Sequence, residues 1–154
     1  MAVDSALGAT RELIGMDLNA LLRRIPIIAI EDVAPVQGID VCIWIMIAYS
    51  KGFKLRKSHI DYIAGFVKSM TNYPRKVRNY NELPVEDQRR SNLSEDKRVL
   101  IECLALRRSY GGMKSDMKMI RVLEDHLKNG KQEILDMNIS DVSVETIPTL
   151  DRGE

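Results

Sequence analysis

The sequence predicts an all-α fold, a compact bundle of five or six helices around one central apolar helix, with a flexible acidic C-terminal tail. Apolar residues recur at spacings of three and four through most of the first 130 residues, as they do on the buried face of a helix. Capping residues and Gly or Pro stops separate these stretches. At 154 residues the chain fits one domain, which we expect over residues 1–130, with an exposed loop at about 72–93 and an acidic, largely flexible tail over 131–154.

The first predicted helix begins at Thr10, whose hydroxyl suits an N-cap, and its apolar stripe continues to Ile25. Residues 1–8 lack such periodicity and are expected to fray. Pro26 has no N–H to donate, so the helix either kinks there or ends and restarts over residues 26–33.

The central helix is predicted over Val41–Lys51, with Asp40 as its N-cap and Gly52 just after its end. Residues 42–47 leave no polar face, and a helix that is apolar on all sides is expected to be buried. Its β-branched residues would also suit a buried strand. Helix is favoured because the flanking segments are helical and no partner strand is evident.

Three further helices complete the bundle. The first begins at Ser58, where Asp61 resembles the partner in a capping box, and ends before Pro74. The second begins at Ser94 and ends at Tyr110-Gly111-Gly112, and the third runs from Ser115 to Asn129-Gly130. In the tail, residues 139–146 alternate in the manner of a lone strand.

Charge is segregated along the chain although the net charge is only +1. Residues 51–78 carry eight basic and one acidic side chains, whereas residues 1–50 and 131–154 are both net acidic. Basic side chains neutralise phosphates, and interleaved aromatic rings stack on exposed bases, so this segment predicts nucleic-acid contact. Alternatively, the aromatic residues belong to the core and the cations form a solvated rim or complement the acidic tail. The basic residues are Lys51, Lys54, Arg56, Lys57, Lys68, Arg75, Lys76 and Arg78, and the aromatic ones are Tyr49, Phe53, Tyr62, Phe66, Tyr73 and Tyr80.

No catalytic, cofactor or metal motif is evident in the sequence, and we predict no catalytic residue, cofactor or metal. Cys42 and Cys103 lie in apolar helical patterns typical of buried free thiols. The cysteines and histidines lie too far apart in sequence to match a metal-ligand spacing. An enzyme would have to assemble its pocket from scattered residues, namely Glu31, Asp32, His59, His126 and Tyr110.

The run from Arg23 to Val33, with two arginines, apolar residues, an alanine and a Glu-Asp pair, resembles a segment in the C-terminal helical collar of clamp-loader-like AAA ATPases of the replication-associated recombination type. The resemblance covers about 30 of the 154 residues, and Pro26 departs from it. The chain contains no GxxxxGK[ST] phosphate loop, so ATP hydrolysis is not carried over. What the resemblance implies is subunit assembly close to DNA.

These observations predict a non-catalytic, intracellular helical module, cytoplasmic or nuclear, that assembles with itself or with a protein partner in DNA replication or repair. Its basic segment would contact nucleic acid. The longest apolar run is about half the length of a membrane span, so no membrane contact is expected. A structural or host-interacting viral or phage protein without a nucleic-acid role is the alternative, beside the small enzyme. The residues expected to serve an interface or a structural role are Arg23, Arg24, Glu31, Asp32 and Trp44.

Overall fold

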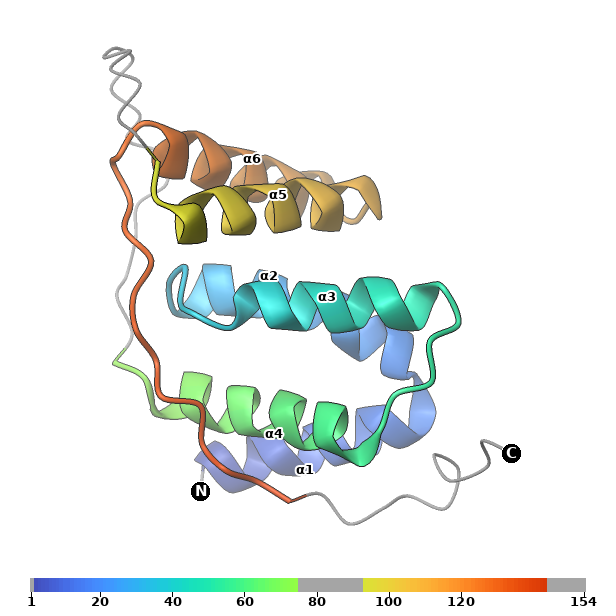
Figure 1. The fold of residues 1–154 in the computed structure, drawn as a ribbon. Coiled ribbons are helices and arrows are strands. Elements are labelled where there is room, and N and C mark those ends of the chain that lie inside the picture. Colours follow the sequence, from blue (N-terminus) through green and yellow to red (C-terminus); the bar gives the residue numbers. More distant parts are fainter. Residues whose placement is uncertain (1, 75–92, 144–154) are drawn as a thin grey trace.

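The protein consists of helix pairs stacked in three layers (Figure 1). The structure, a computed structural model, describes residues 2–74 and 93–143, and within them it contains six helices and no strand. The outer layers are α1 (Ala2–Met16) with α4 (Lys57–Asn72), and α5 (Glu95–Ser109) with α6 (Lys114–Lys128). Between them lie α2 (Leu18–Asp32) and α3 (Ile39–Ser50). The prediction of an all-α bundle is confirmed.

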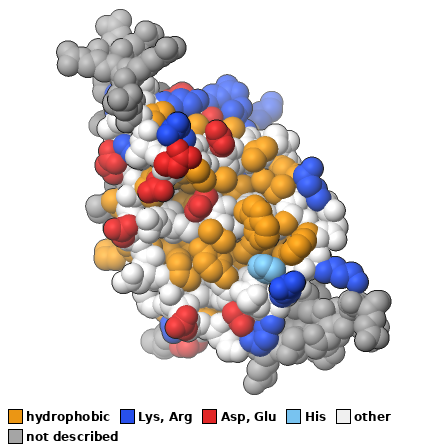
Figure 2. Space-filling model, viewed as in Figure 1, with side chains coloured by type: hydrophobic (Ala, Val, Ile, Leu, Met, Phe, Trp, Pro, Cys, Tyr) orange, Lys and Arg blue, Asp and Glu red, His pale blue; other side chains and the backbone are white. Residues whose placement is uncertain are grey.

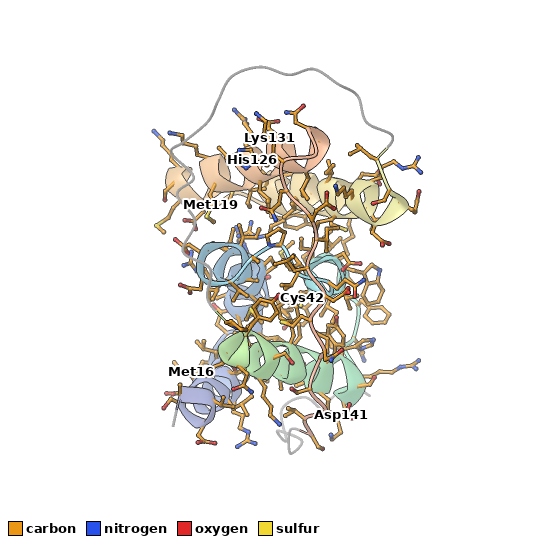
Figure 3. All side chains as sticks on the ribbon, turned by 90° about the vertical axis from the view of Figure 1, so that its left-hand side faces the viewer. Met16, Cys42, Met119, His126, Lys131 and Asp141 are labelled. Carbon is orange, nitrogen blue, oxygen red and sulfur yellow. The ribbon has the colours of Figure 1, made fainter. Side chains whose placement is uncertain are left out.

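The middle layer forms the centre of the core, because helices cover it from both sides. Leu22, Ile27, Ile43 and Met46 are all completely buried. Each buried side chain of this size contributes about 1.5–3 kcal/mol relative to an exposed one. Figure 3 shows side chains filling the space between the layers, with Cys42 in the middle one.

The N-terminal region contains two helices where the sequence analysis placed fraying residues and a single helix beginning at Thr10. Thr10 is buried in α1, and its hydroxyl donates a hydrogen bond to the carbonyl of Ala6 at 2.7 Å instead of capping a helix. The actual break lies at Asp17, whose carboxylate accepts a hydrogen bond from the Ala20 N–H at 2.9 Å. Pro26 lies inside the continuous helix α2, so a restart at that residue was wrong.

The central helix is confirmed as a helix, although its start differs from the prediction. Its N-cap is Gly38, with φ of 93°, and Asp40 lies in the first turn. A Cβ at Gly38 would lie 2.6 Å from the hydroxyl oxygen of Tyr62. Both the left-handed backbone and this close approach therefore require glycine.

The remaining helices begin close to their predicted residues. Ser94 caps α5 by accepting a hydrogen bond from the Lys97 N–H, as predicted. The N-cap of α4 is Arg56, two residues before the predicted Ser58. Similarly, Met113 occupies the N-cap position of α6 where Ser115 was expected.

Residues 131–143, which we call the C-terminal strap, run from the end of α6 across the middle layer to α4 (Figures 1 and 3). Leu135 forms an isolated parallel bridge with Val36, and Met137 is buried. The hydroxyl of Ser69 on α4 donates to the Asn138 carbonyl at 2.8 Å and accepts from the Ser140 N–H at 2.7 Å. The packed chain thus extends beyond the expected domain boundary at residue 130. Residues 139–143 form no strand, and residues 144–154 lie outside the described ones.

Candidate interaction surface

One face of α3 is open to solvent, which corrects the expectation that this helix is buried on every side. The side chain of Trp44 is 51% exposed and that of Val41 is 37% exposed. The two residues are three positions apart and therefore lie on the same face of the helix. Its partner α2 and the helices of the neighbouring layers cover the other sides of α3, and Figure 2 shows hydrophobic side chains gathered across the middle of the open face.

Trp44, Phe53 and His59 form an aromatic surface cluster on this face. The ring centroids of Trp44 and Phe53 are 5.9 Å apart, those of Trp44 and His59 are 6.0 Å apart, and those of Phe53 and His59 are 5.7 Å apart. Trp44 and Phe53 are arranged edge to face, one of the favoured geometries for aromatic pairs. Phe53 is itself 43% exposed, so the cluster presents aromatic rings to solvent.

Local backbone geometry holds the cluster in place. Gly52 adopts φ of 85°, which turns the chain back on α3, and the Phe53 N–H donates to the Ala48 carbonyl at 3.0 Å. His59 lies in the first turn of α4, where its Nδ1 accepts a hydrogen bond from the Arg56 N–H at 2.9 Å. The His59 ring and the backbone of Phe53 are thus held by local hydrogen bonds.

The same connection carries the first half of the predicted basic segment. Lys51, Lys54 and Arg56 are exposed, and Lys57 binds the Asp61 carboxylate at 2.6 Å and the Ser143 hydroxyl at 2.7 Å. We call Lys51, Lys54, Arg56 and Lys57 the basic rim. Figure 2 shows cationic side chains beside a histidine at the edge of the hydrophobic surface.

The other predicted cations are not part of this group. Lys68 is partly buried and lies eleven residues, or about three helical turns, further along α4 than Lys57. Arg75, Lys76 and Arg78 lie outside the described residues.

The aromatic residues expected beside the cations divide between core and surface. Phe66 is completely buried, so it is not available to stack on a base. Tyr49, Tyr62 and Tyr73 are partly buried and pack against the core, whereas Phe53 is exposed. Tyr80 lies outside the described residues. Trp44, the most exposed ring of the surface cluster, was assigned to the apolar helix and not to the stacking residues.

Arg23 and Arg24 join α2 to the turn between α5 and α6. The guanidinium of Arg23 donates to the carbonyls of Tyr110 and Gly111, and Arg24 pairs with the buried Asp116 at 2.8 Å. Arg107, which the sequence analysis did not select, is only 2% exposed and donates from Nε to the Arg23 carbonyl at 2.9 Å. A basic residue at the end of an apolar helical pattern gives no signal that its side chain will be buried.

The residues considered for an enzyme are not brought together. Glu31 and Asp32 are exposed at the end of α2, at the opposite end of the bundle from the start of α4, where His59 lies (Figure 1). His126 lies near the end of α6, also far from His59 (Figure 3). Tyr110 accepts a hydrogen bond from Ser50 at 3.1 Å. Within residues 2–74 and 93–143, no group of three His, Cys, Asp or Glu residues could hold a metal ion.

A cleft of about 450 Å³ borders the open face of α3. Its walls include Val41 of α3, Val99 and Leu100 of α5, Tyr62 of α4 and Met137 of the C-terminal strap. Burial raises the pKa of the Tyr62 hydroxyl above its ordinary value. The cleft extends the apolar surface of α3 onto α5.

Comparison with protein family models, with curated proteins and with solved structures finds no match for this chain. Among the residues described by the structure, no helix combines the length and apolar character needed to cross a membrane. Function therefore has to be inferred from the surface itself.

Proposed function

We propose that this protein is a non-catalytic intracellular helical adaptor that binds single-stranded nucleic acid through the aromatic surface cluster and the basic rim. The observation that carries the proposal is the half-exposed indole of Trp44, which lies against Phe53 and His59. The connection that carries Phe53, together with the first residue of α4, supplies four cations. An aromatic ring that stacks on a base contributes about 1–3 kcal/mol, and Lys and Arg neutralise the neighbouring phosphates.

A single strand fits this surface better than a duplex does. In a duplex the base faces are stacked on one another, so only the cations of the rim would find partners. In a single strand the base faces are free, and the cluster offers aromatic rings that are already packed against one another. We therefore expect tighter binding to a single strand than to a duplex of the same length.

The test measures binding of a fluorescently labelled oligothymidylate, single-stranded or annealed, as the salt concentration rises. Trp44 is the only tryptophan in the chain, so stacking of a base should also quench the intrinsic tryptophan fluorescence. Affinity should fall steeply with salt because phosphate contacts release counterions.

Replacing Trp44 with Ala should weaken single-strand binding by about one order of magnitude, because it removes one stacking ring. The matched control is Leu106→Ala, since Leu106 is 49% exposed on α5 and outside the cluster and the rim. Thermal unfolding of both variants should stay close to that of the parent. Absence of binding at low salt, or equal binding by the Trp44 and Leu106 variants, would refute the proposal.

A protein partner or a second copy is a second candidate, supported by the continuation of the apolar surface onto α5. Val41 and Val99 line the same cleft, and Leu106 follows about two turns further along α5. Contiguous exposed apolar surface commonly marks a protein interface. Light scattering tests it: Leu106→Glu should dissociate an assembly held by this surface while leaving oligonucleotide binding unchanged.

The collar-like run at residues 23–33 supports a place for such an adaptor in DNA replication or repair. In this chain Arg23 and Arg24 are engaged within the protein, so the surface offered to DNA would be the cluster and its rim.

A further inference from the structure

A second cavity, of about 390 Å³, lies where the start of α2 meets the turn between α5 and α6. Three arginines line it, namely Arg23, Arg24 and Arg107, together with the glycines of the turn. No residue of the aromatic surface cluster or of the basic rim contributes to its walls. The cavity is thus separate from the surface proposed to bind single strands.

Arg107 is the most informative of the three, because it is buried and its guanidinium hydrogen-bonds to backbone carbonyls and to no carboxylate of the described residues. Nε donates to the carbonyl of Arg23 and Nη1 to the carbonyl of Gly111, each at 2.9 Å, and both acceptors are neutral. A buried cation is costly unless charge of the opposite sign compensates it. Burial and the nearby charge of Arg23 lower the pKa of Arg107, and the Asp116 carboxylate offsets this lowering only in part.

The acidic groups of the cavity are already engaged. Asp116, which is 4% exposed, pairs with Arg24 at 2.8 Å. The Asp17 carboxylate accepts the hydrogen bond from the Ala20 N–H that caps α2. Three guanidinium groups therefore face two carboxylates, which leaves the cavity with an excess of positive charge.

Two helices also begin at the cavity. The N-cap residues of α2 and α6, Asp17 and Met113, both line it. Met113 has no side-chain oxygen, and α6 has no side-chain hydrogen bond at its cap. The positive ends of two helix dipoles thus add to the charge of the arginines, whereas the C-terminal end of α5 supplies the carbonyls that accept hydrogen bonds from Arg23 and Arg107. Helix N-termini beside arginines form an environment that favours an anion.

We propose that this cavity is a binding site for a phosphate group. The planar guanidinium matches the spacing of phosphate oxygens and can donate two parallel hydrogen bonds. The phosphate could come from a free small anion or from the backbone of a nucleic-acid strand, and both present the same oxygens to the arginines. This inference does not depend on the proposed function.

The test is calorimetric titration of the full-length protein with inorganic phosphate and with pyrophosphate at constant ionic strength. Asn19→Asp is the informative variant, because exposed Asn19 lines the cavity in the first turn of α2, where an acidic residue is compatible with the helix. Ser58→Asp places the same charge at the equivalent position of α4, outside the cavity.

We expect saturable phosphate binding that Asn19→Asp weakens on the order of tenfold through like-charge repulsion, and that Ser58→Asp leaves unchanged. Thermal unfolding of both variants should show that they remain folded. No saturable heat with either anion, or equal affinities for the Asn19 and Ser58 variants, would overturn the proposal.

The two sources of phosphate are distinguished by adding the labelled oligothymidylate. If Asn19→Asp weakens oligonucleotide binding as well, the site holds a backbone phosphate; if only the small anions are affected, the ligand is a free phosphate. Trp44→Ala should bind inorganic phosphate like the parent, so failure of the single-strand proposal and failure of this one are separable.

Discussion

Replacing Gly65 with Ala should show how firmly the C-terminal strap is attached to α4. Gly65 is buried in the interior of α4, and an added Cβ would lie 2.1 Å from the carbonyl oxygen of Ser140. Ordinary contacts of this kind begin near 3.4 Å, so the backbone of the strap would have to move by about 1.3 Å, the difference between the two distances.

The magnitude follows from what such a movement breaks. Ser69 exchanges hydrogen bonds with Asn138 and Ser140, each contributing about 0.5–1.5 kcal/mol, and burial of Met137 contributes about 1.5–3 kcal/mol. Acting in the other direction, Ala is better than Gly inside a helix by roughly 0.5–1 kcal/mol. The net expectation is a loss of about 1.5–5.5 kcal/mol in the free energy of unfolding if all these contacts break, and a smaller loss if only part of the strap is displaced.

The measurement is urea unfolding followed by far-UV circular dichroism, with Gly8→Ala as the matched control. Gly8 lies inside α1, and a Cβ there meets nothing within 4 Å. The control should therefore gain roughly 0.5–1 kcal/mol, whereas Gly65→Ala should lose stability. The two substitutions are chemically identical, so their opposite signs isolate the contact with the strap.

Truncation after residue 130 completes the test, because it removes the strap together with the steric conflict. In the shortened chain, Gly65→Ala should become stabilising, like Gly8→Ala. The reasoning is refuted if Gly65→Ala stabilises the full-length protein, or if it has the same effect in both chain lengths. Either result would mean that the strap does not pack against Gly65 of α4.

Two further predictions concern the interior of the bundle. Glu124 on α6 is 3% exposed, and both its carboxylate oxygens bind the Arg108 guanidinium at 3.2 Å, so Glu124→Gln should lower the free energy of unfolding by about 1–3 kcal/mol. The same change at exposed Glu102 should have an effect within about 0.5 kcal/mol, and similar losses at the two positions in urea unfolding would contradict the pairing. Burial raises the pKa of the Cys42 thiol, and also that of the partly buried Cys103. A disulfide-exchange reagent should therefore label Cys103 slowly in the native protein and Cys42 only after unfolding, whereas equal native rates would place Cys42 near the surface.

The fold class could be predicted because helical periodicity and capping are local properties of the sequence. Ser94 begins α5 with a hydrogen bond to a residue three positions away, and such a contact needs no knowledge of the rest of the molecule. The start of α1 could not be predicted in this way. Only Thr10 and Ile14 are buried in α1, so the helix has little apolar stripe and owes its position to packing against α4.

The candidate site could be predicted only in part, since proximity in sequence was its main clue. The cations from Lys51 to Lys57 do lie together, because one short connection carries them. Lys68 is separated from them by about three turns of α4. The arginine cavity unites residues more than 80 positions apart, and no periodicity within either segment predicts that pairing.

Because Trp44 is exposed, α3 contains residues that stabilise the fold and a residue that remains available for binding. Middle-layer residues such as Met46, only two positions away on α3, are completely buried and hold the layers together. Trp44 leaves half its surface in water, so about half of the hydrophobic free energy of its side chain is not used by the fold. That unused free energy is released only when another molecule covers the ring. The buried side of α3 can therefore form part of the core, while its exposed side is available to bind another molecule.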